Sequence, residues 1–244
     1  ARCYFSLMHT AAGGCMHEGE VATRMGLAGI PETAETIALA QILLLAEQTG
    51  VRAHISQVSC GRSIRMITDA RQRGMRISAD TPLANLLYTD AQVTGYNSLY
   101  NVQPPLRSEA DRQALIAAVA AGDLAISSNH RPHEIAAKKA PFSDAESGMS
   151  QYDCFLPMAM TLVSAGELSL DALINAVSVL PAQILGMAQS VQENSAFNAV
   201  LFDPETERTI TARDLNSRGH NHPALGRSLK GQVQRVFIDG QQIC

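Results

Sequence analysis

Amide and imidazole side chains stand together at the ends of two apolar stretches of the sequence. His54 and Gln57 belong to the segment A-H-I-S-Q-V-S, and Asn129, His130 and His133 belong to N-H-R-P-H-E. Imidazole, thiolate and carboxylate groups bind zinc well, whereas a neutral amide is a poor ligand and has no titratable group for acid–base work. Amides at Gln57 and Asn129 therefore bring neither metal binding nor proton transfer by themselves.

Strand alternation predicts which histidines lie on the same face as Gln57 and Asn129, where a pocket could form. His54 precedes Gln57 by three positions and His130 follows Asn129 by one, so on regular strands both histidines point to the opposite face. We expect them to be hydrogen-bonded, noncatalytic groups, and the same role is favoured for His133, although its loop can reach the pocket. Surface roles on predicted loops are expected for the remaining histidines, which are His9, His17, His220 and His222.

The other residue patterns exclude several kinds of site. The five cysteines lie far apart without a C-x-x-C pair, which indicates idle reduced thiols. No serine has a nucleophile-elbow context, and the glycines near Gly13-Gly14 do not follow the dinucleotide pattern G-x-G-x-x-G. The core is expected to contain Met149, Met158 and Met160.

Composition favours an ordinary globular protein without a nucleic-acid or membrane partner. The chain has 244 residues, 46% hydrophobic and 17% charged residues, and a formal charge of -4. Its basic residues are scattered rather than gathered in a stripe, and the stretch from Ala1 to Met8 lacks the pattern of a signal peptide. These features predict a soluble, cytoplasmic protein.

Helix and strand patterns alternate in the first half of the chain. Pro31 to Gln48 predicts a helix that ends before Gly50, with Pro and Glu in the first turn and a wide apolar face. Strand, helix and strand follow over Val51–Val58, Ser63–Arg73 and Met75–Ala79. This order predicts a parallel sheet.

The second half continues the alternation and then changes character. Ser108 and Asp111 form a capping-box-like helix start, the helix ends at Gly122, and Leu124–Ser128 is the next predicted strand. Further predicted elements are helices at Phe155–Ser164 and Ser169–Val179, a short turn opened by Pro181, β segments at Ala199–Phe202 and Gln234–Ile238, and a hairpin turn at Asp239-Gly240. We therefore expect two parts, an α/β unit over residues 1–190 and a small β appendage over residues 191–244.

An opening strand around Arg2 to Phe5 brings the number of predicted parallel strands to about four, whereas a closed (βα)8 barrel needs eight. Open strand edges invite pairing with another chain. We therefore expect the chain to be part of a longer polypeptide, or to be completed by a partner segment or a second copy.

Four segments resemble the long-chain bacterial dihydroorotases of the amidohydrolase superfamily. Residues 13–20 and 25–35 are similar to that family's glycine-rich loop and the helix after it. Residues 101–108 (N-V-Q-P-P-L-R-S) are similar to its N-P-P-L-R signature, and residues 129–134 lie where the family has D-H-A-P-H. Residues 216–223 resemble its S-K-G-x-N-x-P stretch. The resemblance implies the C-terminal half of a (βα)8 TIM-type barrel, strands five to eight, with part of a small β-sandwich appendage.

The same resemblance implies that the active-site positions have changed. Active members hold zinc with ligands from strands absent here, a histidine on strand five, a histidine on strand six and an aspartate on strand eight that also moves protons. Those last three positions fall on Tyr4, Gln57 and Asn129, which are unsuited to these roles. Gln103 and His133 fall on substrate-contacting positions of the family.

These replacements suggest a noncatalytic dihydroorotase-like protein of pyrimidine biosynthesis that needs no cofactor. By resemblance, such a protein is an assembly partner of aspartate carbamoyltransferase catalytic chains. One alternative is an active zinc-dependent dihydroorotase that recruits Tyr4, Gln57 and other groups in an unusual site. A weaker alternative is a ligand-binding sensor that uses Gln103 and His133.

Overall fold

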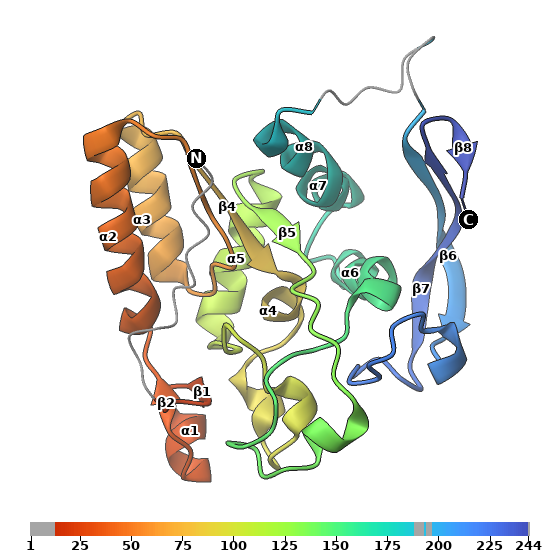
Figure 1. Ribbon diagram of the computed structural model, residues 1–244, viewed down its shortest axis with the longest axis horizontal. Coiled ribbons are helices and arrows are strands. Elements are labelled where there is room, and N and C mark those ends of the chain that lie inside the picture. Colours follow the sequence, from red (N-terminus) through yellow and green to blue (C-terminus); the bar gives the residue numbers. More distant parts are fainter. Residues whose placement is uncertain (1–12, 188–192, 194–196, 244) are drawn as a thin grey trace.

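A three-stranded parallel sheet lies at the centre of the molecule (Figure 1). The computed structural model describes residues 13–187, 193 and 197–243. Strand β4 (Ile77–Pro82) lies between β3 (Ala53–Ile55) and β5 (Ala125–Ser127), and both pairings are parallel. The α/β class and these strand positions are confirmed, while the predicted strand at Arg2–Phe5 lies outside the described residues.

Helices α2 (Thr33–Thr49), α3 (Gly61–Gln72) and α5 (Glu109–Ala120) cover one side of this sheet (Figure 1). All three were predicted, and their ends follow local chemistry. Gly50 ends α2 in a left-handed conformation with φ 64°, which glycine adopts without strain. The Ser108 hydroxyl accepts the Asp111 N–H at 3.2 Å, as the capping-box pattern indicates.

The helices that follow β5 differ in part from the prediction. Helix α6 (Phe155–Ser164) has the predicted bounds. The helix predicted over Ser169–Val179 is confirmed, with Ser169 as its N-cap, but the separate turn predicted at Pro181 is wrong. Instead α7 (Leu170–Ile174) continues through a π-helical turn, Asn175–Val179, directly into α8 (Leu180–Leu185). The Leu180 N–H donates to the Asn175 carbonyl in the π-helical pattern, so the α-helical hydrogen-bond pattern is already interrupted before Pro181 and the missing N–H of this proline does not end the helix.

A small subdomain lies beyond the carboxyl ends of the central strands. It contains β1 (Met16–His17), α1 (Glu20–Met25) and β2 (Gly29–Ile30), with β1 and β2 paired in parallel. Its apolar core is separate from the main one and consists of Met16, Ala22, Val93 and Phe142. The remaining short helices are α4 (Leu83–Leu87), Asp90–Val93, Ser98–Tyr100, Ile135–Lys138, Tyr152–Cys154 and Ala212–Asp214.

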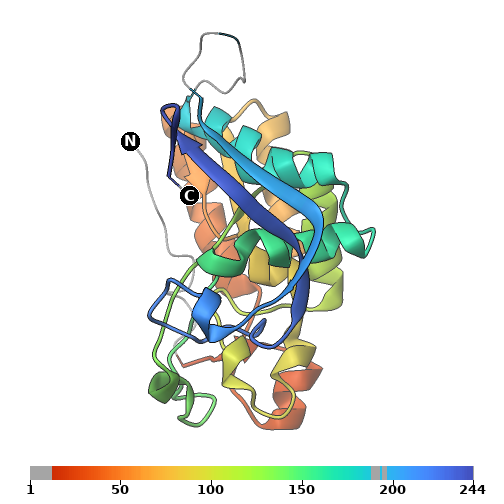
Figure 2. The same cartoon turned by 90° about the vertical axis from the view of Figure 1, so that its right-hand side faces the viewer.

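Two long antiparallel strands form an outer layer over α6 (Figure 2). β6 (Ala199–Thr209) pairs with β7 (Ser228–Ile238), and β7 pairs with the short β8 (Gln241–Gln242). The predicted β segments are thus correctly placed but much too short, because cross-strand pairing extends them through polar residues. The turn at Asp239-Gly240 is confirmed, with φ of 48° and 77°.

The main core lies between the sheet and its helices. Met149, Met158 and Met160 are 2%, 3% and 4% exposed, so their predicted core positions are confirmed. At Gly231 an added Cβ would lie 2.7 Å from the Met160 side chain, so β7 can pack on α6 only without a side chain there. No helix in the described part of the chain combines the length and the apolar character that a bilayer crossing requires.

Candidate functional site

The structure brings three of the predicted site residues together. Gln57 Nε2 donates a hydrogen bond of 2.9 Å to Asn129 Oδ1, and Asn129 Nδ2 donates one of 2.7 Å to the Gln103 carbonyl. Gln57 follows β3, Asn129 follows β5, and Gln103 lies in the loop before α5. The side-chain amides of Gln57 and Asn129 and the backbone carbonyl of Gln103 therefore form a chain, called the amide chain below, across the carboxyl ends of the sheet.

The backbone at both amides departs from a strand. Gln57 has φ 63° and Asn129 has φ 44°, which is the left-handed region that L side chains rarely adopt. β3 ends at Ile55 and β5 at Ser127, so neither amide is part of a regular strand. The side-chain directions predicted from strand alternation are therefore wrong at both positions.

His54 is held close to the amide pair by a carboxylate that our sequence analysis missed. Its Nε2 lies 2.8 Å from Asp80 Oδ2, its Nδ1 lies 2.9 Å from Ser78 Oγ, and Asp80 Oδ1 accepts the Gln57 N–H at 3.1 Å. Both ring nitrogens are occupied, which agrees with a hydrogen-bonded role for His54. The only sequence signal for Asp80 was an acidic residue directly after the strand predicted over Met75–Ala79.

Asp80 is 6% exposed and remains a strong hydrogen-bond acceptor. Burial raises the pKa of its carboxyl group, but the hydrogen bonds donated by His54, Ser127, Ser56 and the Gln57 backbone outweigh this effect. The net result is a pKa below the ordinary value for aspartate.

The two histidines after β5 are occupied by local contacts. His130 Nδ1 accepts the N–H groups of Gln151 and Tyr152 at 2.9 and 3.1 Å, and its ring stacks on Tyr152 with centroids 4.2 Å apart. His133 places Nε2 3.1 Å from the Ser147 carbonyl, and its backbone N–H donates to Asn221 Oδ1. Among the described residues no hydrogen bond joins His133 to the amide chain.

The other predicted positions have mixed outcomes. Tyr4 and His9 lie outside the described residues. His17 is half-buried, with Nδ1 3.3 Å from Arg107 Nη1. The surface role predicted for His222 is wrong, because this side chain is 3% exposed and its Nδ1 accepts the Ala224 N–H at 2.9 Å. No residue next to His222 in the chain predicts this burial, because groups near its ring such as Asp153 and His130 are distant in the sequence.

The chemistry of the amide chain does not fit zinc. Gln57 and Asn129 supply amide groups that already bond to each other, and the described residues contain no group of three or more histidine, cysteine, aspartate or glutamate side chains able to hold a metal ion.

Thiol chemistry at the two buried cysteines is also disfavoured. Burial raises the pKa of Cys60 to about 12 and that of Cys154 to about 11, so both thiols stay protonated.

A family profile and the sequences of known proteins point to the same family. The sequence profile of the family described as "Dihydro-orotase-like" matches residues 8–63. A "Dihydroorotase-like protein" of Pseudomonas aeruginosa is 47% identical over 232 residues, which is 94% of this chain and 55% of that protein. A "Dihydroorotase" of Desulfotalea psychrophila is 39% identical and is covered to the same extent. The chain spans about half the length of these relatives.

Solved structures agree with this result. A D-hydantoinase has a TM-score of 0.77 at 25% identity, over 87% of this chain and 49% of that one. The inactive dihydroorotase-like domain of the Chaetomium thermophilum CAD-like multifunctional protein has a TM-score of 0.61 at 22% identity, over 93% of this chain and 63% of that one. The chain thus shares the α/β, TIM-barrel-type fold of amidohydrolases. It belongs to the dihydroorotase-like family of the amidohydrolase superfamily.

Proposed function

We propose that this chain is part of a noncatalytic dihydroorotase-like protein of cytoplasmic pyrimidine biosynthesis. Its role is to support the assembly of aspartate carbamoyltransferase, whose catalytic chains are its partners. The observation that carries this proposal is the hydrogen bond between Gln57 and Asn129, because two amides face each other where active members of the family place a zinc ligand and an acid–base aspartate.

The amides at Gln57 and Asn129 lack the groups that hydrolysis needs. An amide side chain has no titratable acid–base group in the working pH range, and the loss of a general acid–base group costs about two to four powers of ten in rate. Asn129 Nδ2 donates to the Gln103 carbonyl and Asn129 Oδ1 accepts from Gln57, so both polar atoms of the Asn129 side chain already have partners. A hydrolytic reaction at this place would need other groups for both metal binding and proton transfer.

An assembly role explains why the fold persists while the site has changed. A fold can be retained for the surface that it offers rather than for its chemistry. The Pseudomonas relatives that carry "-like" in their names are 47% identical to this chain, against 39% for the Desulfotalea relative named "Dihydroorotase". This order supports a place among the members named "Dihydroorotase-like" rather than among those named "Dihydroorotase".

The proposal includes an architecture for the whole protein. Residues 1–190 supply strands five to eight of a (βα)8 barrel, residues 191–244 supply part of a β-sandwich appendage, and the rest of a longer chain or a partner segment supplies the other strands. α2 supports this view, because it exposes an apolar face at Ile37, Leu44 and Leu45, which are 50%, 66% and 57% exposed. A neighbouring helix would bury such a face.

The decisive experiment is metal analysis and a dihydroorotase assay on the full-length protein. The proposal expects zinc far below one per chain and no hydrolysis of dihydroorotate above the buffer rate. Zinc near one per chain together with turnover would overturn it. A bacterial dihydroorotase purified in the same way serves as the positive control.

The partner is tested separately by co-expression with aspartate carbamoyltransferase catalytic chains. Co-elution of the two proteins at a fixed ratio is expected, together with transcarbamoylase activity that falls when this protein is omitted. Failure to associate at micromolar concentrations would contradict the assembly role and would leave the absence of turnover to be decided by the dihydroorotase assay.

Two other functions are supported by specific observations. Relatives named "Dihydroorotase" at 35–39% identity favour an active zinc-dependent enzyme, which the metal and turnover measurements decide. The half-buried Gln103 and His133 favour a ligand-binding sensor. Thermal stabilisation by dihydroorotate or carbamoyl aspartate would support that function.

A further inference from the structure

The Asp80 carboxylate connects all three strands of the parallel sheet. It lies on the central strand β4 and is 6% exposed. Oδ2 contacts His54 Nε2 from β3 at 2.8 Å, and Oδ1 accepts the Ser127 hydroxyl from β5 at 2.5 Å. One side chain thus fixes the spacing of the strands from which Gln57 and Asn129 follow.

The turn that contains Gln57 is hydrogen-bonded to Asp80. The Gln57 N–H donates to Asp80 Oδ1 at 3.1 Å, and the next N–H, that of Val58, donates to the Asp80 backbone carbonyl at 2.8 Å. Two consecutive backbone groups are therefore bound to a single residue. This arrangement accounts for the left-handed φ of 63° at Gln57, which needs surrounding contacts to persist in a residue other than glycine.

His54 completes the network on the same side of the sheet. Its register partner on β4 is Ser78, and its ring contacts both Ser78 Oγ and Asp80. Because an ionised carboxylate only accepts hydrogen bonds, His54 Nε2 carries the proton in its contact with Asp80. The imidazole therefore holds Asp80 Oδ2 in place, a role called the brace below, while Asp80 Oδ1 accepts hydrogen bonds from the Gln57 N–H and the Ser127 hydroxyl.

We propose that Asp80 is the positioning residue of the candidate site. It sets the direction of the Gln57 side chain through the Gln57 N–H, with His54 as its brace, and so keeps the Gln57 amide on Asn129. This role goes beyond the assembly function and is independent of whether the full-length protein hydrolyses dihydroorotate.

The test is Asp80→Asn in the full chain, followed by NMR of the side-chain amide protons. The replacement keeps the size of the side chain but turns one acceptor oxygen into a donor, which opposes the donors from His54 or from Gln57 and Ser127. We expect exchange with water at Gln57 Nε2 and Asn129 Nδ2 to become about tenfold faster or more. Backbone amides inside α3 and α5 should keep their slow exchange, which separates loss of positioning from general unfolding.

Asp123→Asn is the matched control, because Asp123 is an exposed aspartate whose side chain contacts Arg71. It should leave both side-chain amides at their wild-type exchange rates. Wild-type rates in Asp80→Asn would overturn the proposal.

A second pair of variants keeps the proposal testable if Asp80→Asn does not fold. His54→Gln retains a donor that reaches Asp80, whereas His54→Leu removes it. Fast exchange in the leucine variant and slow exchange in the glutamine variant would support the brace. Equal and slow exchange in both variants would contradict it.

Discussion

Glu35 Oε2 and Arg107 Nη2 lie 3.7 Å apart, and each of these two side chains is only 1% exposed. Glu35 also accepts the backbone N–H of Ser59 at 3.1 Å and the Ser59 hydroxyl, while Arg107 donates to the Ile30 carbonyl at 2.8 Å. The pair therefore joins the first turn of α2, the segment before α3 and strand β2.

Arg107→Met tests how strongly this pair stabilises the fold. The variant leaves the Glu35 carboxylate buried without its cation, and removing one partner of a buried ion pair costs about 3–5 kcal/mol. Urea denaturation followed by circular dichroism should show a fall of that order in the free energy of unfolding.

An exposed ion pair provides the control. Arg62 contacts Glu32 at 3.0 Å, with side chains 55% and 40% exposed. Arg62→Met should cost less than about 1 kcal/mol, because solvent screens exposed pairs. Similar losses in the two variants would contradict the importance of burial.

Asn129→Asp tests the amide chain. Asn129 Nδ2 donates to the Gln103 carbonyl, and an ionised aspartate would place two acceptors against each other at a cost of about 1–3 kcal/mol. A protonated aspartate can still donate, so the folded state should raise the pKa of this carboxyl above its unfolded value of about 3.9. The penalty is therefore absent below that pH and grows as the pH rises.

Thermal melts of Asn129→Asp and wild type over pH values of about 3.5 to 7.5 measure this difference. We expect the two melting temperatures to converge at the acid end and to separate towards neutral pH. A constant difference at all pH values would show that the Gln103 contact is not involved. The variant should also gain no dihydroorotase activity.

The sequence was most informative where structure depends on neighbouring residues. The helix start at Ser108 and the turn at Asp239-Gly240 follow from hydrogen bonding and φ preferences within a few residues, and both are confirmed. The length of β7 and the union of α7 with α8 depend on pairing and packing with distant segments. Local patterns cannot contain that information.

The candidate site was predictable in composition but not in geometry. Gln57, Gln103 and Asn129 were selected by family resemblance, and the structure brings them into one hydrogen-bonded chain. Asp80 was missed because a single carboxylate within a strand has no spacing pattern. His54 could be linked to it only once the register of β3 and β4 was known.

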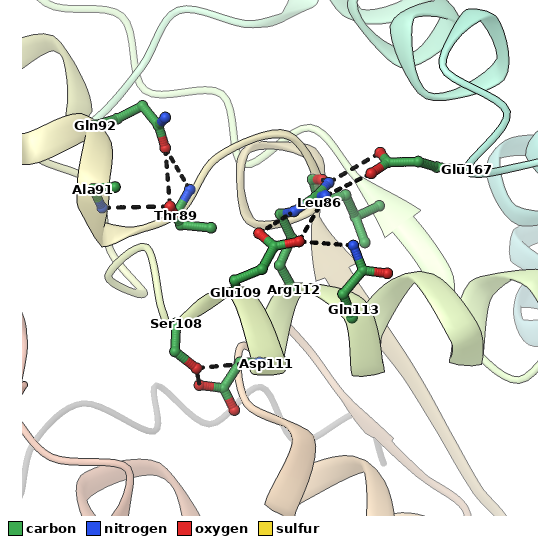
Figure 3. A network of polar contacts seen from close by, with 10 residues as sticks. All are labelled: Leu86, Thr89, Ala91, Gln92, Ser108, Glu109, Asp111, Arg112, Gln113 and Glu167. Atoms are coloured by element: carbon green, nitrogen blue, oxygen red, sulfur yellow. Dashed lines mark hydrogen bonds and ion pairs between the residues drawn. The ribbon is translucent and has the colours of Figure 1, made fainter.

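Arg112→Met tests a polar network at the start of α5 (Figure 3). Arg112 bonds to both oxygens of Glu167 and of Glu109 and donates to the Leu86 carbonyl at 2.9 Å. Its side chain is 13% exposed, and the hydrogen bonds from Arg112 lower the pKa of Glu167. We expect Arg112→Met to lower the free energy of unfolding by about 1–3 kcal/mol in urea denaturation.

Glu109→Gln is the companion variant for this network. Glu109 is 58% exposed at its side chain, so its loss of charge should cost less than about 1 kcal/mol. A larger loss for Glu109→Gln than for Arg112→Met would mean that the exposed partner, rather than the bridge to Glu167 and Leu86, stabilises the segment.

The buried His222 should make the free energy of unfolding depend on pH between neutral and acid conditions. Burial lowers the pKa of this histidine to about 4, whereas the unfolded chain has a value near about 6.5. Between these values the unfolded state binds more protons, so stability is highest above about pH 6.5 and falls as the pH drops towards 4. The contribution lost over this window is of the order of 3 kcal/mol.

His222→Gln removes the titration while keeping a polar side chain of similar size. Unfolding free energies measured in urea at several pH values should show a flatter dependence between about pH 4 and 6.5 for this variant than for wild type. An unchanged slope in His222→Gln would mean that the imidazole is not held neutral in the folded state, and that buried carboxylates cause the acid sensitivity instead.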